Sequence, residues 1–386
     1  MIKRDYYSAC LATAAKRSPV TALLGPRQCG KTTLARIFGR QHKSHYFDLE
    51  SPADQQRLQN PELILNSLQG LIILDEIQIM PGLFNILRVL VDRPENRQHF
   101  LVLGSASPHI IRNVSETLAG RVEFIELAGF NIQEINNIEQ LWLRGGFPRS
   151  FLAASESDSR AWRDGFIRTF LERDIPMLGI TIASAAMRRF WTMLAHFHGQ
   201  TWNASDLARS MGLSDKTVRS YLDILTATFM VRQLQPWHEN LRKRQVKSPK
   251  IYFRDSGLLH SLLNIPDYHS LTGNPRLGAS WEGFALEQVL QIIHPAEAYF
   301  WATHSGAELD LLFFRKGKRY GVEFKFNEAP GITKSMHIAV KDLSLDYLWV
   351  VYPGKEEYPV TDKIMVRPLN KIRCGDIDNK PGLIPK

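Results

Sequence analysis

The sequence is poor in cysteine, and its cysteines form no pattern. Its 386 residues contain three of them, Cys10, Cys29 and Cys374. They are odd in number and far apart, which argues against a disulfide framework, and no pair has the spacing of zinc ligands. Reduced thiols are typical of an interior compartment, so we expect a cytoplasmic protein.

Long apolar runs are also missing. The apolar run at 9–15 is short and has a charged residue on each side, so it predicts a helix leading into the first strand and not a signal segment. No stretch is long enough to cross a membrane. We therefore expect no membrane association.

Repeats and low-complexity tracts are absent, and the composition is that of a folded protein. Hydrophobic residues make up 44% and charged residues 23%. A chain of this length predicts roughly two to four domains. The net charge of +9 favours a polyanionic partner, nucleic acid first and an acidic membrane surface second.

The first third of the chain alternates short apolar strands with helices. The pattern predicts strands at 20–24, 45–49, 71–74 and 99–103, and helices at 31–39 and 83–91. Buried strands separated by helices predict a parallel sheet covered on both faces. The middle reads as helical and the end as strand-rich. We predict four domains, with boundaries at 1–130, 131–198, 199–254 and 255–386.

The segment GPRQCGKTT fits the pattern GxxxxGK[ST] and lies between an apolar strand and a helix, which is the context of a P-loop. Glycines let the backbone wrap phosphates at the helix N-terminus. Lys31 is expected to reach the β- and γ-phosphates, and the Thr32 hydroxyl to bind Mg²⁺. A chance glycine-rich turn is the alternative. The predicted nucleotide-binding residues are Gly25, Pro26, Arg27, Gln28, Cys29, Gly30, Lys31, Thr32 and Thr33.

The strand in LIILDEIQ ends in two acids. Asp75 is assigned to the magnesium ion and Glu76 to polarising the attacking water. Ser105, at the end of the next strand, is the candidate γ-phosphate sensor, although serine is common in turns. Arg121 in LAGRVEF is the candidate arginine finger and is favoured over Arg112; a surface ion pair is the alternative.

Residues 205–222 predict a helix, a turn at Gly212 and a second helix capped by Ser214. With a following strand this is a winged-helix pattern. Lys216 and Arg219 would point outward from the recognition helix toward DNA. A module used only for protein contacts is the alternative.

A basic stretch follows at 239–254, with aromatic residues nearby. Such a stretch is an electrostatic footprint for a nucleic-acid backbone, and a solvated basic loop is the alternative. The predicted contacts are Arg242, Lys243, Arg244, Lys247 and Lys250.

Residues 306–326 predict a hairpin in which Lys316 and Gly317 form the turn and Arg315 faces Lys318. The register then places Asp310 opposite Glu323, with Glu308 and Lys325 on the same face.

Two opposed carboxylates about 5 Å apart repel each other unless a cation separates them, and Mg²⁺ suits such oxygen ligands. Lys325 would orient or help to deprotonate a metal-bound water. The acid followed by Glu-x-Lys resembles the PD-(D/E)XK nuclease pattern. By that resemblance Glu282, favoured over Glu287, becomes a further metal ligand beside Asp310 and Glu323. A salt-bridge ladder, or a nuclease fold without activity, is the alternative.

Nearly the whole chain resembles a group of prokaryotic AAA-type ATPases with a C-terminal domain of unknown function. The resemblance rests on GPRQCGKTTL, LDEIQ, LAGRV, GGFP, LERDI, KSPKIYFRDSGLL, GAELDLLF and GVEFKF, in that order. It implies an α/β multi-domain protein with a P-loop AAA-type parallel-sheet core that takes ATP, a helical and winged-helix middle, and a PD-(D/E)XK nuclease-like α/β end. Relatives tend to have Ser-Asn where this chain has Ser105-Ala106, which weakens the sensor assignment.

Together these patterns predict an ATPase that uses ATP and Mg²⁺, acts on DNA as a homo-oligomer, and carries a metal-dependent nuclease at its C-terminal end. An ATP-dependent switch or scaffold with an inactive nuclease-like domain is the alternative. A regulator that recognises an operator is a weaker one, since the helix-turn-helix lies in mid-chain.

Overall fold

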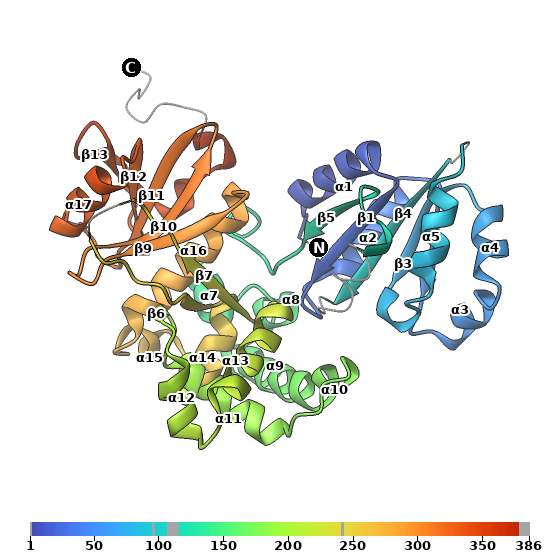
Figure 1. Cartoon of the computed structure of the whole chain (residues 1–386), viewed down its shortest axis with the longest axis horizontal. Helices are drawn as coiled ribbons and strands as arrows, with labels where there is room; N and C mark the ends of the chain where they lie inside the picture. The colour runs from blue at the N-terminus through green and yellow to red at the C-terminus, as the bar shows by residue number, and fades with distance from the viewer. Residues whose placement is uncertain (1, 95–96, 106–115, 241–242, 378–386) are drawn as a thin grey trace. The chain divides into compact units, whose positions relative to one another are not determined.

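The chain forms two compact units. The computed structural model describes residues 2–94, 97–105, 116–240 and 243–377. Unit 1 comprises Met1–Gly129 with Ala227–Phe229, and unit 2 comprises Phe130–Thr226 with Met230–Lys386. The elements of both are labelled in Figure 1.

Unit 1 is built on a five-stranded sheet in the order β2-β3-β4-β1-β5, and every neighbouring pair is parallel. The predicted parallel sheet is therefore confirmed. The strands are β1 (Val20–Gly25), β2 (Ser44–Asp48), β3 (Gly70–Asp75), β4 (Gln98–Ser105) and β5 (Val122–Glu126). The helices are α1 (Asp5–Arg17), α2 (Lys31–Arg40), α3 (Pro52–Arg57), α4 (Pro61–Ser67) and α5 (Leu83–Val91).

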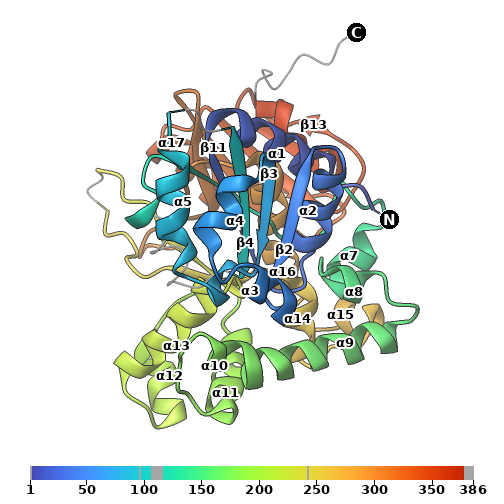
Figure 2. The same cartoon turned by 90° about the vertical axis from the view of Figure 1, so that its right-hand side faces the viewer.

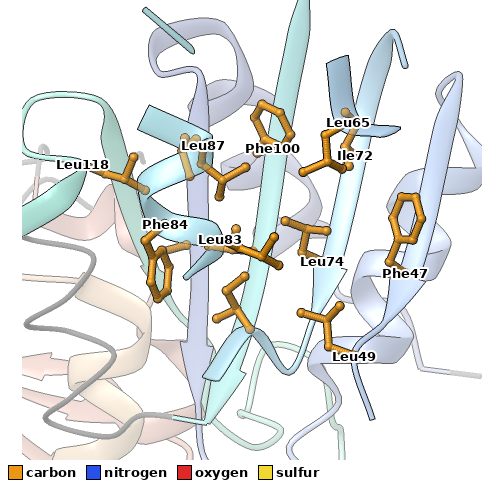
Figure 3. Close-up of a cluster of buried hydrophobic side chains, with 14 of the residues drawn as sticks. Phe47, Leu49, Leu65, Ile72, Leu74, Leu83, Phe84, Leu87, Phe100 and Leu118 are labelled. Carbon is orange, nitrogen blue, oxygen red and sulfur yellow. The ribbon is translucent and has the colours of Figure 1, made fainter. Parts of the chain in front are cut away.

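Both faces of this sheet are buried, as its continuous apolar strands require. On one face Ile72 and Leu74 of β3 pack with Leu65 of α4 and Leu87 of α5 (Figure 3). The intervening Ile73 points to the other face, where it lies against α2. Truncating a fully buried leucine such as Leu74 to alanine is expected to cost about 2–5 kcal/mol.

Unit 2 begins with helices. Figure 2 shows α9 running on into α10, through a π turn at Phe170–Asp174. The helices are α7 (Ile138–Arg144), α8 (Pro148–Phe151), α9 (Glu156–Thr169), α10 (Ile175–Met177), α11 (Ser184–Ala195), α12 (Ala204–Met211), α13 (Asp215–Ala227), α14 (Ser256–Leu262), α15 (Tyr268–Thr272), α16 (Leu277–Ile293) and α17 (Lys334–Asp342).

A nine-stranded mixed sheet completes unit 2, in the order β13-β14-β12-β11-β10-β9-β7-β8-β6. The strands are β6 (Gln200–Thr201), β7 (Val231–Pro236), β8 (Lys250–Phe253), β9 (Ala298–Ala302), β10 (Glu308–Arg315), β11 (Lys318–Phe324), β12 (Tyr347–Tyr352), β13 (Tyr358–Pro359) and β14 (Ile364–Pro368). The segments 199–254 and 255–386 thus share one sheet, because Gln235 and Pro236 of β7 pair with Tyr299 and Phe300 of β9.

The predicted helix-turn-helix elements are present as α12 and α13, with Gly212 in the left-handed conformation between them. The predicted hairpin is confirmed in its register. Arg315 pairs with Lys318, and the ladder continues to Leu311 opposite Val322. Both turn residues, Lys316 and Gly317, have positive φ, as the tightest hairpin turn requires.

None of the described helices is both long and apolar enough for a membrane span.

Candidate nucleotide site and carboxylate cluster

The predicted P-loop leaves the carboxyl end of β1 and enters α2 at Lys31. Gly25 has no room for a side chain, because a Cβ there would lie 2.1 Å from the carbonyl oxygen of Leu127. Gln28 and Gly30 have positive φ, of 64° and 104°. The loop therefore turns tightly and leads into the N-terminus of α2. The free backbone N–H groups of a helix N-terminus bind anions well.

Lys31 is buried within this loop, with 4% of its surface exposed. Its Nζ donates to the carbonyl oxygens of Gly25 at 2.9 Å and Pro26 at 2.8 Å. Those bonds place the ammonium in the concave side of the loop, which is where phosphate oxygens would meet it. Thr32, the next residue, is half-buried at the start of α2.

Asp75 ends β3 at the same edge of the sheet, because parallel strands bring their carboxyl ends together. It is 3% exposed. Its Oδ2 accepts a bond from the Tyr46 hydroxyl at 2.7 Å, and its Oδ1 accepts one from the Glu76 backbone N–H at 3.0 Å. An oriented carboxylate at the carboxyl edge of the sheet fits the magnesium role predicted for Asp75.

Glu76 is held in a left-handed backbone conformation, with φ of 54°. Strained non-glycine residues of this kind cluster at functional sites. Gln78 donates to its carboxylate. Burial raises the pKa of Glu76, and the charge of Lys31 opposes that shift. A carboxylate with a raised pKa at this position is suited to accepting a proton from water.

Ser105, the last residue of β4, pairs with Gly25, the last residue of β1. The strand β4 lies between β3 and β1, from which the P-loop leaves. The backbone of Ser105 thus lies beside the strand end from which the P-loop leaves. Arg121 immediately precedes β5, whose first residue Val122 pairs with Val20 at the amino end of β1.

Arg121 therefore lies at the sheet edge opposite its own P-loop, roughly 20 Å away along a six-residue strand. It forms an ion pair with Asp92, from Nε to Oδ1 at 2.6 Å. A finger role thus requires a nucleotide bound to another subunit. Arg112 lies outside the described residues.

Arg4 is a site residue that the motifs did not reveal. Its guanidinium donates to the carbonyl oxygen of Cys29 in the P-loop at 3.3 Å, and to those of Ala128 at 3.0 Å and Gly129 at 2.8 Å. The KRDYY segment at the N-terminus is its only local signal. Arg4 joins the outside of the loop to the end of the unit-1 core.

Unit 2 contains a second group of charges, the carboxylate cluster. Its members are Lys250, Glu282, Glu308, Asp310, Glu323 and Lys325. Asp310 and Glu323 are buried, at 5% each. The backbone N–H of Asp310 donates to Glu323 Oε2 at 3.3 Å, and that of Phe324 donates to Asp310 Oδ2 at 3.0 Å. The predicted proximity of these two acids is confirmed.

Lys250 is the unexpected member of the cluster. It was predicted to contact a nucleic-acid backbone, but it is buried at 4% exposure. Its Nζ lies 3.3 Å from Glu282 Oε1 and 3.5 Å from Asp310 Oδ1, and it also pairs with Glu308. The strand pairing of β8 turns this side chain inward, which a local run of basic residues does not reveal.

The oxygen donors of this cluster suit a hard divalent cation, but their arrangement does not. The ammonium of Lys250 lies among three of the acids. In the described part of the chain, no group of three or more histidine, cysteine, aspartate or glutamate side chains is placed to hold a metal ion. The predicted ligands Glu282, Asp310 and Glu323 therefore offer no ready-made metal site.

The lysines of the cluster act as cations. Lys325 Nζ lies 3.2 Å from Glu323 Oε1. Burial works against its charge, but Glu323 and Asp310 raise the pKa of Lys325 above its usual range. This favours the orienting role predicted for Lys325 over proton abstraction. Burial, and then the charge of Asp310, raises the pKa of both Glu282 and Glu323.

Glu287, the other helix acid, is engaged elsewhere. It is 2% exposed, and its Oε2 lies 3.0 Å from Arg232 Nη2 and 3.6 Å from Arg254 Nε. Glu282 in contrast reaches the cluster, where its Oε1 accepts a bond from the Tyr252 hydroxyl at 2.6 Å. Of the two helix acids, Glu282 therefore belongs to the carboxylate cluster and Glu287 does not.

The remaining predicted nucleic-acid contacts differ in their surroundings. Lys216, Arg219, Arg244 and Lys247 are exposed. Lys243 is also exposed, but its Nζ lies 2.6 Å from Asp342 Oδ2. Arg242 lies outside the described residues.

Three family models match the chain. An AAA domain matches residues 17–136, a domain of unknown function (DUF8612) matches 135–269, and another domain of unknown function (DUF4143) matches 277–372. An uncharacterized protein of Mycobacterium bovis and one of Mycobacterium tuberculosis are each 50% identical over 387 residues, which spans all of this chain and 88% of each relative. The chain belongs to their family. It carries a P-loop ATPase domain of the AAA type.

A solved structure agrees with this fold. The Walker-type ATPase of Pyrococcus abyssi aligns with a TM-score of 0.50 over 68% of this chain and 96% of that chain. At 14% identity this likeness shows the fold alone. The C-terminal match is to a domain of unknown function, so it names no activity for unit 2.

Proposed function

We propose that this AAA-family protein is a magnesium-dependent ATPase that couples ATP hydrolysis to the handling of DNA in the cytoplasm, and that it works as a homo-oligomer. The ATPase part rests on one observation. The P-loop lysine and an oriented pair of acids lie at the same edge of the unit-1 sheet. Lys31 is held in the loop, and Asp75 and Glu76 end the strand that lies across β4 from it.

The residues of this site have separate roles in the proposal. Lys31 neutralises charge on the β- and γ-phosphates, and the N-terminus of α2 adds its backbone N–H groups. Thr32 and Asp75 hold the magnesium ion, which when bound neutralises phosphate charge. Glu76 takes the proton of the attacking water, and Ser105 contacts the γ-phosphate.

The DNA part rests on charge and on the helix-turn-helix elements. The chain carries a net charge of +9, and α13 exposes Lys216 and Arg219 after the turn at Gly212. We interpret α12, α13 and the strands β7 and β8 as a winged-helix module that contacts DNA. Phosphate contacts of this kind position a strand without reading its sequence.

We also propose that the carboxylate cluster is a phosphodiester-cleaving centre of the PD-(D/E)XK type. Its support is the confirmed hairpin register, which brings Asp310, Glu323 and Lys325 together. The half-buried ammonium of Lys325 would stabilise negative charge that develops on a phosphate. Because no metal site is ready-made, cleavage requires the cluster to rearrange when substrate arrives.

A second function is favoured by the position of Lys250. Its ammonium already neutralises Glu282, Glu308 and Asp310. A cluster balanced in this way can serve as a rigid part of a DNA grip without cutting, and the protein is then an ATP-dependent switch or scaffold.

One experiment separates these functions. Labelled linear DNA and four-way-junction DNA are incubated with the wild type, Lys31→Ala and Lys325→Ala, each with and without ATP and magnesium. Cutting that is lost in Lys325→Ala and altered in Lys31→Ala is the result expected of a coupled nuclease. Intact DNA, with ATP hydrolysis and DNA binding retained, would establish the switch. Absence of ATP hydrolysis by the wild type would overturn the whole proposal.

A further inference from the structure

A cavity of about 870 Å³ opens in unit 2. One wall is the start of the helix-turn-helix, at Thr201 to Ala204, and another is the loop between Gln245 and Pro249. Three cationic side chains line it, from Arg219 on α13 and from Arg244 and Lys247 on the loop, together with His304.

The charges of this pocket are not balanced by acids. Among the residues that the structure describes, its lining contains no aspartate or glutamate. Arg219, Arg244 and Lys247 have no salt-bridge partner among the residues that the structure describes, whereas the nearby Lys243 and Arg209 are paired with Asp342 and Asp206. Three exposed cations around one concavity repel one another, and an anion placed between them relieves that repulsion.

We infer that this basic pocket binds the phosphate backbone of a single-stranded polynucleotide. The inference rests on the proposed DNA-handling function and names its substrate class. A volume of about 870 Å³ is within the range of pockets that enclose a compact ligand, so it accepts one or two nucleotides of a flexible strand. A duplex is a rigid cylinder and reaches only the rim.

The chain connects the basic pocket directly to the carboxylate cluster. Pro249 lines the pocket, and the next residue, Lys250, is the buried cation of the cluster. On the other side, His304 lies in the turn between β9 and β10, and β10 then begins with Glu308. The Cα atoms of Lys247 and Lys250 are therefore at most roughly 11 Å apart, by the length of three residues. A single-stranded polynucleotide bound in the basic pocket would therefore lie close to the carboxylate cluster.

The test is binding of a short fluorescein-labelled single-stranded oligonucleotide, followed by anisotropy in EDTA and without nucleotide, so that no cleavage occurs. The variants are Arg219→Gln, Arg244→Gln and Lys247→Gln. Each is expected to raise the Kd about tenfold and to lower the salt slope by about 0.7, the value for one phosphate contact on a single strand. Arg209→Gln, with the same charge change on α12, is the matched control and should alter the Kd by less than about twofold.

Thermal unfolding of each variant checks that it is folded. Wild-type affinity in all three folded pocket variants would overturn the pocket while leaving DNA handling intact. No binding of any nucleic acid by the wild type would overturn both. Tighter binding of duplex than of single strand, or displacement of the oligonucleotide by inorganic phosphate at concentrations near the oligonucleotide's Kd, would also reject a single-stranded polynucleotide as the ligand.

Discussion

Tyr46 illustrates how a residue outside any motif can position the nucleotide site. It lies on β2, next to β3, and its hydroxyl donates to Asp75 Oδ2 at 2.7 Å. Arg36 donates to the same hydroxyl at 3.2 Å and stacks over the ring. Burial, and then the bond to Asp75, raises the pKa of Tyr46, so the hydroxyl keeps its proton and remains a donor.

Tyr46→Phe removes this donor and keeps the ring. A hydrogen bond to a charged group contributes about 1.5–3 kcal/mol, so Asp75 should lose part of its orientation. We expect the magnesium concentration for half-maximal ATP hydrolysis to rise about tenfold, with little change in magnesium-free ATP binding. A magnesium titration of the hydrolysis rate measures this. Tyr6→Phe, an exposed tyrosine of unit 1, is the control, and an unchanged magnesium requirement in Tyr46→Phe would exclude the positioning role.

At this scale the sequence predicted the residues whose chemistry is tied to a fixed spacing. GPRQCGKTT and LDEIQ identify Lys31, Asp75 and Glu76 because a phosphate-binding turn and a strand end require those types. Tyr46 and Arg4 act through contacts that are distant along the chain, so no local pattern contains them. The prediction that Lys250 contacts nucleic acid failed for the same reason, since the partners of Lys250 come from α16 and β10.

Among the secondary-structure elements, β8 determines the charge balance of the carboxylate cluster, because its first residue, Lys250, points inward. Burial works against the charge of this lysine, but Tyr252 and the three neighbouring acids raise the pKa of Lys250 above its usual range. The ammonium is thus a fixed countercharge. The register of the hairpin β10–β11 was predictable from its two-residue turn. The ammonium of Lys250, which neutralises the acids of β10, was not predictable.

Lys250→Met should convert the cluster into a cation site. Without the ammonium, Glu282, Glu308 and Asp310 lack their nearest positive charge, and breaking such buried pairs costs about 3–5 kcal/mol. We expect Lys250→Met to be less stable, to bind Mn²⁺ at least tenfold more tightly than wild type by calorimetry, and to regain unfolding midpoint on Mn²⁺ addition. Lys250→Met/Asp310→Asn is the control and should lose the gain. Equal Mn²⁺ binding by wild type and Lys250→Met would contradict this account.

The packing of α14 against α16 makes the folding stability depend on pH. His260 is fully buried; one ring nitrogen lies 2.7 Å from Ser280 Oγ and the other 3.0 Å from the carbonyl oxygen of Leu143. Burial lowers the pKa of His260 from 6.5 to about 4. The unfolded chain therefore binds more protons than the folded one between these values, and the stability present above pH 6.5 is lost as the pH falls toward 4.

His260→Gln tests this dependence. The wild type should lose roughly 2 kcal/mol through this histidine between pH 7 and pH 5. The glutamine variant is expected to be less stable at pH 7 but to lose less on acidification, as measured by urea unfolding at both values. The same loss in both proteins would show that His260 does not titrate in this way.

We propose that the molecule combines a nucleotide unit with a unit that handles DNA. The arginine-finger role proposed for Arg121 is the part of this proposal that requires assembly. Arg121 lies at the wrong edge of the sheet for its own P-loop. The sequence predicted the parallel ATPase sheet well, because its apolar strands and motifs are local. It did not predict the single nine-stranded sheet of unit 2, because the β7–β9 pairing joins residues far apart in the chain.

Arg121→Ala and Glu76→Gln should complement each other if the finger acts between subunits. Each variant alone is expected to hydrolyse ATP at least about 100-fold more slowly than wild type. Mixed oligomers contain some sites with an intact Glu76 and an intact partner arginine, so mixing should restore activity well above the sum of the two. Arg17→Ala, a surface arginine paired with Glu123, is the control. No gain on mixing, with oligomers formed, would exclude the finger role.

The central claim is that this P-loop site hydrolyses ATP in response to DNA. The most direct measurement is the steady-state rate of ATP hydrolysis by the wild type and by Glu76→Gln, with and without single-stranded DNA. The account predicts magnesium-dependent hydrolysis that DNA changes at least about twofold, and a Glu76→Gln protein that still binds ATP but turns it over about 100-fold more slowly or less. Wild-type turnover in Glu76→Gln, or a rate indifferent to every DNA tested, would contradict it.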